Sequence, residues 1–101
     1  MNIDEVARCL SELGNTVRLE IFRLLVRAGD EGLSISEIRN AIGIPASTLG
    51  FHLRGLVEAG LVLQERRGRE VRCRANYPRL RGAIDFVMEE CCKGAAVVQE
   101  L

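Results

Sequence analysis

The chain has 101 residues, 48% of them hydrophobic, and its 14 basic residues balance 14 acidic ones. This length predicts one domain with a modest core, which a partner subunit could complete. No apolar run approaches the roughly 20 residues that a membrane-spanning helix needs, and the N-terminal residues are acidic where a secretory signal is basic. We therefore expect a cytoplasmic protein without membrane contact, whose four cysteines stay reduced.

Helical spacing of apolar residues predicts a first helix over residues 3–13. Its inner face is expected to contain Ile3, Val6, Leu10 and Leu13. A second helix follows from residue 16, with Asn15 as its cap and its end at Gly29. The pattern S-x-x-E at residues 34–37 is a capping box, which predicts a short third helix that ends before Gly43.

A fourth helix is predicted to begin at Pro45, where a missing N–H does no harm, and to stop at Gly60. Its core-facing stripe is expected to be Leu49, Leu53, Leu56 and Val57. From residue 61 the apolar spacing changes from helical to alternating. Residues 61–66 and 70–75 flank the sequence RGR and predict a two-stranded hairpin with a glycine turn.

In the second strand of the hairpin, the alternation directs Cys73 inward as a small packed side chain. Pro78 begins a last helix, which is predicted to extend to Cys92. The fold class is therefore mainly α with a small β-hairpin, in the order α-α-α-α-β-β-α. We expect one domain over residues 1–92 and a C-terminal tail over 93–101.

The third and fourth helices, joined by a short turn and followed by a basic hairpin, are typical of a winged helix-turn-helix, whose second helix enters the major groove of DNA. The core stripe leaves a set of outward positions near the start of the fourth helix. We expect these residues to contact DNA: Ser47, Thr48, Gly50, Phe51 and Arg54. Glycine inside a helix costs roughly 1 kcal/mol relative to alanine, which a close approach of DNA or of another helix would explain. The alternative is a solvated helix without a ligand.

His52 is the only histidine, and no nucleophile or acid nearby completes a catalytic group with it. We expect it to support the recognition helix or to contact DNA. Since the chain also has no C-x-x-C motif, an enzyme is not predicted. A module that binds only other proteins is the remaining alternative, and the basic hairpin argues against it.

Positive charge is concentrated in the second half of the chain. Residues 54–81 contain eight arginines and three acids, whereas both ends of the chain are acidic. Three of these arginines, Arg66, Arg67 and Arg69, lie at the hairpin turn, and we expect them to contact DNA phosphates. The alternative is that they only keep the turn soluble.

Three segments together resemble the ArsR/SmtB family of small winged-helix repressors over nearly the whole chain: NTVRLEIFRLL, PASTLGFHLRGLVEAGLV and RRGREVRCRA. The resemblance implies a homodimer built by the first and last helices. It also implies repression at a double-stranded operator with inverted half-sites, relieved by a metal, metalloid or redox signal, with no cofactor required. The C-V-C motif of many arsenic sensors and the Asp/His pairs of zinc sensors are both absent.

Cys91 and Cys92 are adjacent, near the end of the chain. Adjacent α-carbons lie about 3.8 Å apart, which is too close for an unstrained disulfide. Two thiolates presented together suit a soft, thiophilic ion. The pair also resembles that of an arsenite-responsive branch of the family, which implies arsenite as the inducer.

Trivalent arsenic takes three sulfurs, and Cys9 is the preferred third ligand because the family's first and last helices meet at the dimer interface. Cys73 is the second choice. Two alternatives for the cysteine pair remain open. The first is that both cysteines only pack a dimer helix. The second is that they respond to a redox or persulfide signal, or to another thiophilic metal.

Overall fold

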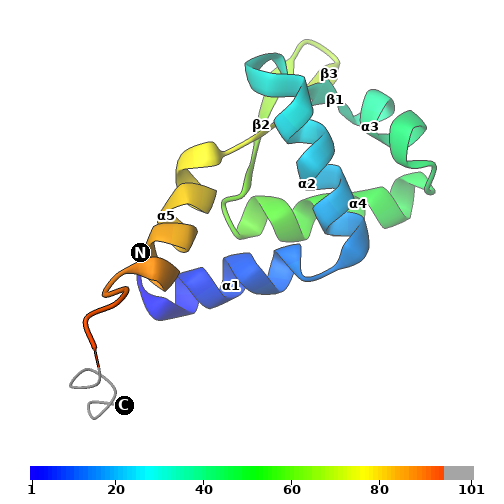
Figure 1. Ribbon diagram of the computed structural model, residues 1–101. Helices are drawn as coiled ribbons and strands as arrows, with labels where there is room; N and C mark the ends of the chain where they lie inside the picture. The colour runs from blue at the N-terminus through cyan, green and yellow to red at the C-terminus, as the bar shows by residue number, and fades with distance from the viewer. Residues whose placement is uncertain (95–101) are drawn as a thin grey trace.

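Five α-helices, one 3₁₀ helix and three β-strands make up the winged helix-turn-helix fold of the protein, seen in a computed structural model that describes residues 1–94 (Figure 1). In chain order the elements are α1 (Ile3–Leu13), α2 (Thr16–Ala28), η1 (Gly29–Glu31), β1 (Leu33–Ser34), α3 (Ile35–Ile42), α4 (Ala46–Glu58), β2 (Val62–Arg67), β3 (Glu70–Ala75) and α5 (Tyr77–Met88). None of the helices within residues 1–94 is long and apolar enough to span a lipid bilayer.

Side-chain caps fix where the first three helices begin, and those of the second and third helices are as predicted. The side chains of Asn2 and Asn15 each accept a hydrogen bond from a backbone N–H in the first turn of α1 and α2. Ser34 and Glu37 form the predicted capping box, in which each side chain accepts a hydrogen bond from the backbone N–H of the other residue. Gly43 then ends α3 in the left-handed conformation, with φ at 77°.

The sheet has three antiparallel strands in the order β1-β3-β2, one more than the hairpin that the sequence predicts. Strand β1 has only two residues, too few to show an alternating pattern, and it pairs Leu33 with Cys73 of β3. Gly32 precedes it with φ at +65°, and a Cβ atom at this position would collide with the carbonyl oxygen of Cys73. The unpredicted strand therefore depends on a glycine at residue 32.

The core lies between the helices and the inner face of the sheet. Its fully buried members include Ile21, Leu25, Ile38, Leu49, Leu56, Leu61, Val62, Cys9 and Cys73. The inner face of α1 is not as predicted, because Val6, Cys9 and Glu12 are buried while Ile3 and Leu10 are 68% and 47% exposed. The apolar residues of α1 extend around more of the helix than the core covers, so those on one side of the helix are exposed to solvent.

The last helix is shorter than predicted, because α5 ends at Met88 and not at Cys92. Glu89 has an extended conformation, and the chain then turns, with the N–H of Cys91 donating to the carbonyl oxygen of Met88 at 3.1 Å. Two adjacent acids, Glu89 and Glu90, disfavour further helix here because the C-terminal end of a helix carries partial negative charge. Of the expected tail over 93–101, residues 95–101 lie outside the described part of the chain.

Candidate nucleic-acid interface and thiol pair

Helix α4 separates its core-facing and outward residues as the sequence predicts. Leu49, Leu53 and Leu56 are buried, and Val57 is half-buried. Of the predicted contact residues, four are exposed and two are half-buried. The exposed ones are Ser47, Thr48, Phe51 and Arg54, and the half-buried ones are Gly50 and His52. The structure therefore places all six on one helix without burying any of them in the core.

Gly50 has no packing reason inside the protomer. A Cβ atom at this position would meet no atom closer than the terminal nitrogen of Arg54, at 3.9 Å. Gly50 and Arg54 instead line a hollow of about 360 Å³ that reaches Gln64 on strand β2. The sequence offered two explanations of this glycine, close approach of DNA or of another helix. Within the described residues no other helix comes close to Gly50, so the explanation that remains is close approach of a ligand.

A chain of ionic contacts holds α4 against α1 and α2. Glu12 of α1 is buried and forms ion pairs with Arg8, at 3.2 Å, and with Arg18 of α2. Arg18 also donates from Nε to Nδ1 of His52 at 3.1 Å, and Arg8 pairs with Glu58 at the far end of α4. The middle and the C-terminal end of the recognition helix are thus fixed to the body of the protein through charged groups.

The same contacts determine the state of His52. Its Nδ1 accepts the hydrogen bond from Arg18, so the neutral ring is the one that fits. Burial, and after it the positive charge of Arg18, lower the pKa of His52 below its usual value, against a smaller opposing effect of Glu12. The hydrogen bond from Arg18 fits the supporting role that was one of the two predicted alternatives for His52, and contact of His52 with DNA stays a prediction.

Glu12, Arg18 and Gly55 form the support of the recognition helix, and sequence reasoning missed them. A Cβ atom at Gly55 would overlap the carboxylate of Glu12 and lie 3.1 Å from Cζ of Arg18, so only glycine leaves room for this ion pair. Two signals in the sequence could have revealed the arrangement. Glu12 has the same helical spacing as the buried Val6 and Cys9, and Gly55 lies inside a helix.

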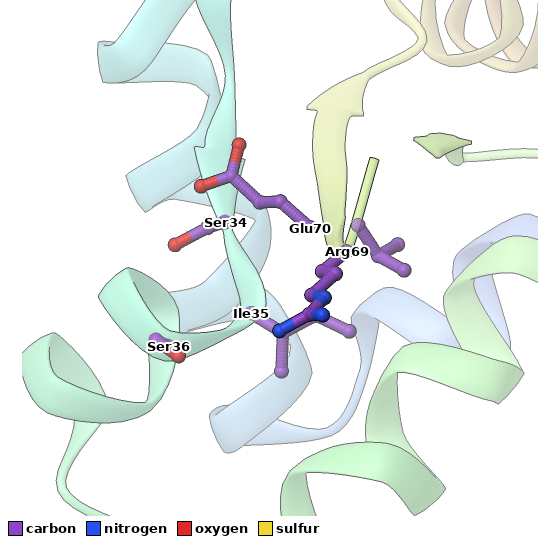
Figure 2. A pocket seen from close by; sticks show the side chains of 6 residues that line it. Ser34, Ile35, Ser36, Arg69 and Glu70 are labelled. Carbon is purple, nitrogen blue, oxygen red and sulfur yellow. The ribbon is translucent and has the colours of Figure 1, made fainter. Parts of the chain in front are cut away.

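The hairpin presents its arginines close to the start of α3. The turn consists of Gly68 and Arg69, with Arg67 opposite Glu70. Arg69 and Glu70 face Ser34, Ile35 and Ser36 across an open hollow of about 410 Å³ (Figure 2). The tip of the hairpin therefore lies beside the helix pair, as a winged helix-turn-helix requires.

The three wing arginines differ in their contacts. Arg67 pairs with Glu65 at 3.3 Å and lies 4.0 Å from Glu31. Within residues 1–94, Arg66 and Arg69 form no ion pair. Arg72, further along β3, has a structural role, because it donates to the carbonyl oxygen of Glu31 at 2.9 Å and also pairs with Glu37 and Glu70. Arg66 and Arg69 are thus the wing arginines available to an external anion.

The four cysteines divide into two buried and two exposed thiols. Cys73 is buried in the sheet as predicted, and burial raises the pKa of its thiol. Cys91 and Cys92 are exposed, with their sulfur atoms 3.0 Å apart. The hydrogen bond between these two thiols raises the pKa of Cys91.

The predicted role of Cys9 at a dimer interface requires it to lie near the surface, but the structure buries it. It is fully buried between α1 and α4, and its Sγ donates to the carbonyl oxygen of Ala59 at 3.5 Å. The same oxygen accepts a hydrogen bond from Nε of Arg79 on α5 at 2.9 Å. Among the described residues no group of three potential metal ligands is assembled, so the structure brings Cys91 and Cys92 together without Cys9.

Residues 13–65 of the chain match the protein family described as a helix-turn-helix domain. A comparison with curated protein sequences gave no match.

Several solved structures resemble the chain over most of its length. An ArsR-like transcriptional regulator from Rhodococcus is 27% identical, with a TM-score of 0.74, over 83% of this chain and 76% of that one. A homodimeric winged helix-turn-helix DNA-binding domain from Mycobacterium bovis, described as a possible ArsR-family transcriptional regulator, is 28% identical, with a TM-score of 0.70, over 90% and 84% of the two chains. The transcriptional repressor BigR from Xylella fastidiosa is 27% identical, with a TM-score of 0.66, over 89% and 90%.

Proposed function

This chain belongs to the helix-turn-helix domain family, and on that premise we propose that it is a dimeric transcriptional repressor that trivalent arsenic releases from its operator DNA. Its family and fold are those of transcriptional regulators and not of enzymes. The observation that carries the proposal is the joint exposure of the outward face of α4 and of the wing arginines Arg66 and Arg69.

Binding to DNA divides between these two elements. The exposed residues of α4 offer hydroxyl, apolar and guanidinium groups, which suit the base edges of the major groove. The wing arginines suit phosphate oxygens, which bind protein without regard to sequence. Because the ion pairs of Glu12 and Arg18 fix α4 on its scaffold, the helix enters the groove with little loss of conformational freedom.

Dimerisation is supported by apolar side chains that the protomer leaves uncovered. They lie on α1 and α5, which are next to each other at one end of the molecule (Figure 1): Ile3, Leu10, Ile84, Val87 and Met88. Exposed apolar side chains on two neighbouring helices support an interface at this end of the molecule. A two-fold dimer presents two identical recognition helices and therefore reads inverted half-sites.

Capture of arsenic is assigned to Cys91 and Cys92. At neutral pH arsenite is the uncharged acid As(OH)₃, which meets two thiols whose sulfur atoms lie 3.0 Å apart. Two As–S bonds form as two As–O bonds break, and each thiol proton leaves with a hydroxide as water. Nothing is oxidised or reduced, and one hydroxyl stays on arsenic until a third thiol replaces it and releases a third water.

We assign the third thiol to Cys9, which links capture to DNA release. To reach arsenic, Cys9 must leave the core and give up its hydrogen bond to Ala59, the residue that ends α4. Arg79 of α5 donates to the same carbonyl oxygen. Movement of α1 and α5 would therefore shift the recognition helix, and its two copies in a dimer would no longer match the spacing of the half-sites.

The proposal is tested by titrating arsenite into a complex of the full chain with a duplex selected from a random library, followed by fluorescence anisotropy. The wild type should leave the DNA. The Cys91→Ser, Cys92→Ser double variant should bind DNA as well as the wild type and ignore arsenite. Cys9→Ser should respond weakly, because serine can keep the bond to Ala59 but does not bind arsenic.

Cys73→Ser is the matched control, since it removes a thiol outside the proposed site and should respond like the wild type. Release of the double variant by arsenite would place the sensor elsewhere. Antimonite, cadmium, zinc and polysulfide are titrated in parallel. If cadmium or polysulfide releases the DNA and arsenite does not, the inducer is another thiophilic metal or a redox signal that acts at the same thiols.

A further inference from the structure

Phe51 is an aromatic side chain that the core does not use. It lies on the outward face of α4, between the buried Leu49 and Leu53 in sequence, and is 53% exposed. Exposure of about half of this apolar side chain to water is unfavourable in the free protein. The ring is therefore explained by something that covers it in a complex.

The ring is held on a fixed support. The guanidinium of Arg18 lies 5.1 Å from its centroid, and the His52 ring meets it edge to face at 5.6 Å. Arg18 is itself fixed by its ion pair with Glu12, in which both side chains are at most 15% exposed. Phe51 is thus oriented before any ligand arrives, and binding costs it little rotamer freedom.

We infer that Phe51 packs on the 5-methyl group of a thymine in the major groove and so makes that thymine a required base of each half-site. The inference rests on the DNA-binding function proposed above. A phenyl ring has no hydrogen-bond donor or acceptor, so it cannot read the polar edges of the bases. The methyl group of thymine is the one apolar feature that a base presents in the major groove.

The same chemistry predicts a response to cytosine methylation. A cytosine carrying a 5-methyl group presents a methyl at the same place in the groove as thymine does. A G·C pair at the position that Phe51 contacts should therefore bind poorly, and methylation of its cytosine should recover part of the affinity.

The test uses a duplex selected by the wild-type chain, in which each thymine is replaced singly by deoxyuridine, so that only the methyl group is removed. At one thymine per half-site we expect the affinity of the wild type to fall about fourfold, the value for one buried methyl-sized group. Phe51→Ala should bind the unmodified duplex more weakly and be insensitive to that replacement. Phe51→Leu, which keeps an apolar side chain, should retain part of the sensitivity.

The outcomes separate this inference from the function on which it rests. If the wild type selects no duplex, the DNA-binding function is wrong. If a duplex is selected but no uridine replacement weakens binding, or if Phe51→Ala is as sensitive as the wild type, the assignment of Phe51 to thymine is overturned and the DNA-binding function stands. Thermal unfolding of each variant checks that the change does not reflect misfolding.

Discussion

Gly50 and Gly55 lie on the same helix and have opposite surroundings, which makes them a matched pair. A side chain at Gly50 has open space, whereas one at Gly55 would overlap the ion pair of Glu12 and Arg18. Gly50→Ala should raise the free energy of unfolding by about 0.4–1 kcal/mol, as alanine does in a helix. Gly55→Ala should lower it, and urea unfolding of both variants measures the contrast. Equal effects would show that the ion pair does not constrain α4.

His52 makes the stability of the fold depend on pH. Its pKa is lowered in the native protein, chiefly by burial and then by Arg18. As the pH falls through about 6.5, His52 therefore binds a proton in the unfolded chain, whereas in the native state it remains neutral until a lower pH. The free energy of unfolding should decrease from pH 7.5 towards the lowered native pKa, and the contribution of His52 should be fully present above about 6.5.

His52→Asn is the control for this effect, because an amide oxygen can accept the bond from Arg18 but does not titrate in this range. Urea unfolding at several values between about pH 5.5 and 7.5, on either side of the usual histidine pKa, should give a shallower pH dependence for the variant than for the wild type. Parallel curves for the two proteins would remove His52 as the cause.

Sequence reasoning predicted which residues of α4 lie outside the core and missed the contacts that support them, for a physical reason. The outward face of α4 follows from the spacing of Leu49, Leu53 and Leu56, which is a local pattern. Arg18 contacts His52 across 34 positions of the chain, and no periodicity within one helix shows such a pair. Cys9 shows the same limit, because the helix that contains it is as predicted, while its burial against Ala59 at the end of another helix is not.

At the scale of elements, the wing should contribute affinity without sequence preference. Changing Arg66 and Arg69 to glutamine should weaken binding to all duplexes alike. It should also reduce the slope of log affinity against log salt by roughly 0.9 for each phosphate that the variant no longer neutralises. Arg23→Gln with Arg27→Gln on α2 removes the same charge elsewhere and should leave the slope close to that of the wild type. Identical slopes for both double variants would exclude the wing from the interface.

Element boundaries are predictable where a local residue sets them and not where packing does. Asn15 and the capping box of Ser34 and Glu37 fix the starts of α2 and α3 as predicted. Strand β1 escapes prediction because two residues carry no pattern and its pairing with β3 is long-range. Helix α5 ends at Met88, before the predicted end at Cys92. The sequence did not predict this end, because the spacing of the apolar residues does not show where packing against the rest of the protein stops.

At the scale of the whole molecule, the exposed side chains of α1 and α5 should be needed for assembly. Ile84→Glu with Val87→Glu should convert a dimer into a folded monomer, because charges at the centre of an apolar interface are not paired. The affinity for the operator should also fall, since a monomer binds only one half-site. Light scattering after size-exclusion chromatography measures the mass.

Leu19→Glu with Val26→Glu is the control, because these α2 residues are also exposed, at 42% and 41%, but lie outside the α1 and α5 surface. This variant should remain a dimer. A dimeric α5 variant together with a monomeric α2 variant would move the interface to α2.

Because two of the four thiols are buried and two are exposed, the rate at which each thiol is labelled reports local unfolding of the structure around it. Under native conditions a thiol reagent should modify Cys91 and Cys92 at once, and Cys9 and Cys73 only when the structure around them opens. In the Cys91→Ser, Cys92→Ser variant the two buried thiols are the only ones left to label, Cys9 on the inner face of α1 and Cys73 on the central strand of the sheet. Equal labelling rates for Cys9 and Cys73 would indicate that the protein opens as a single cooperative unit. A faster Cys9 would indicate that α1 detaches first, which is the movement that arsenic capture by this thiol requires.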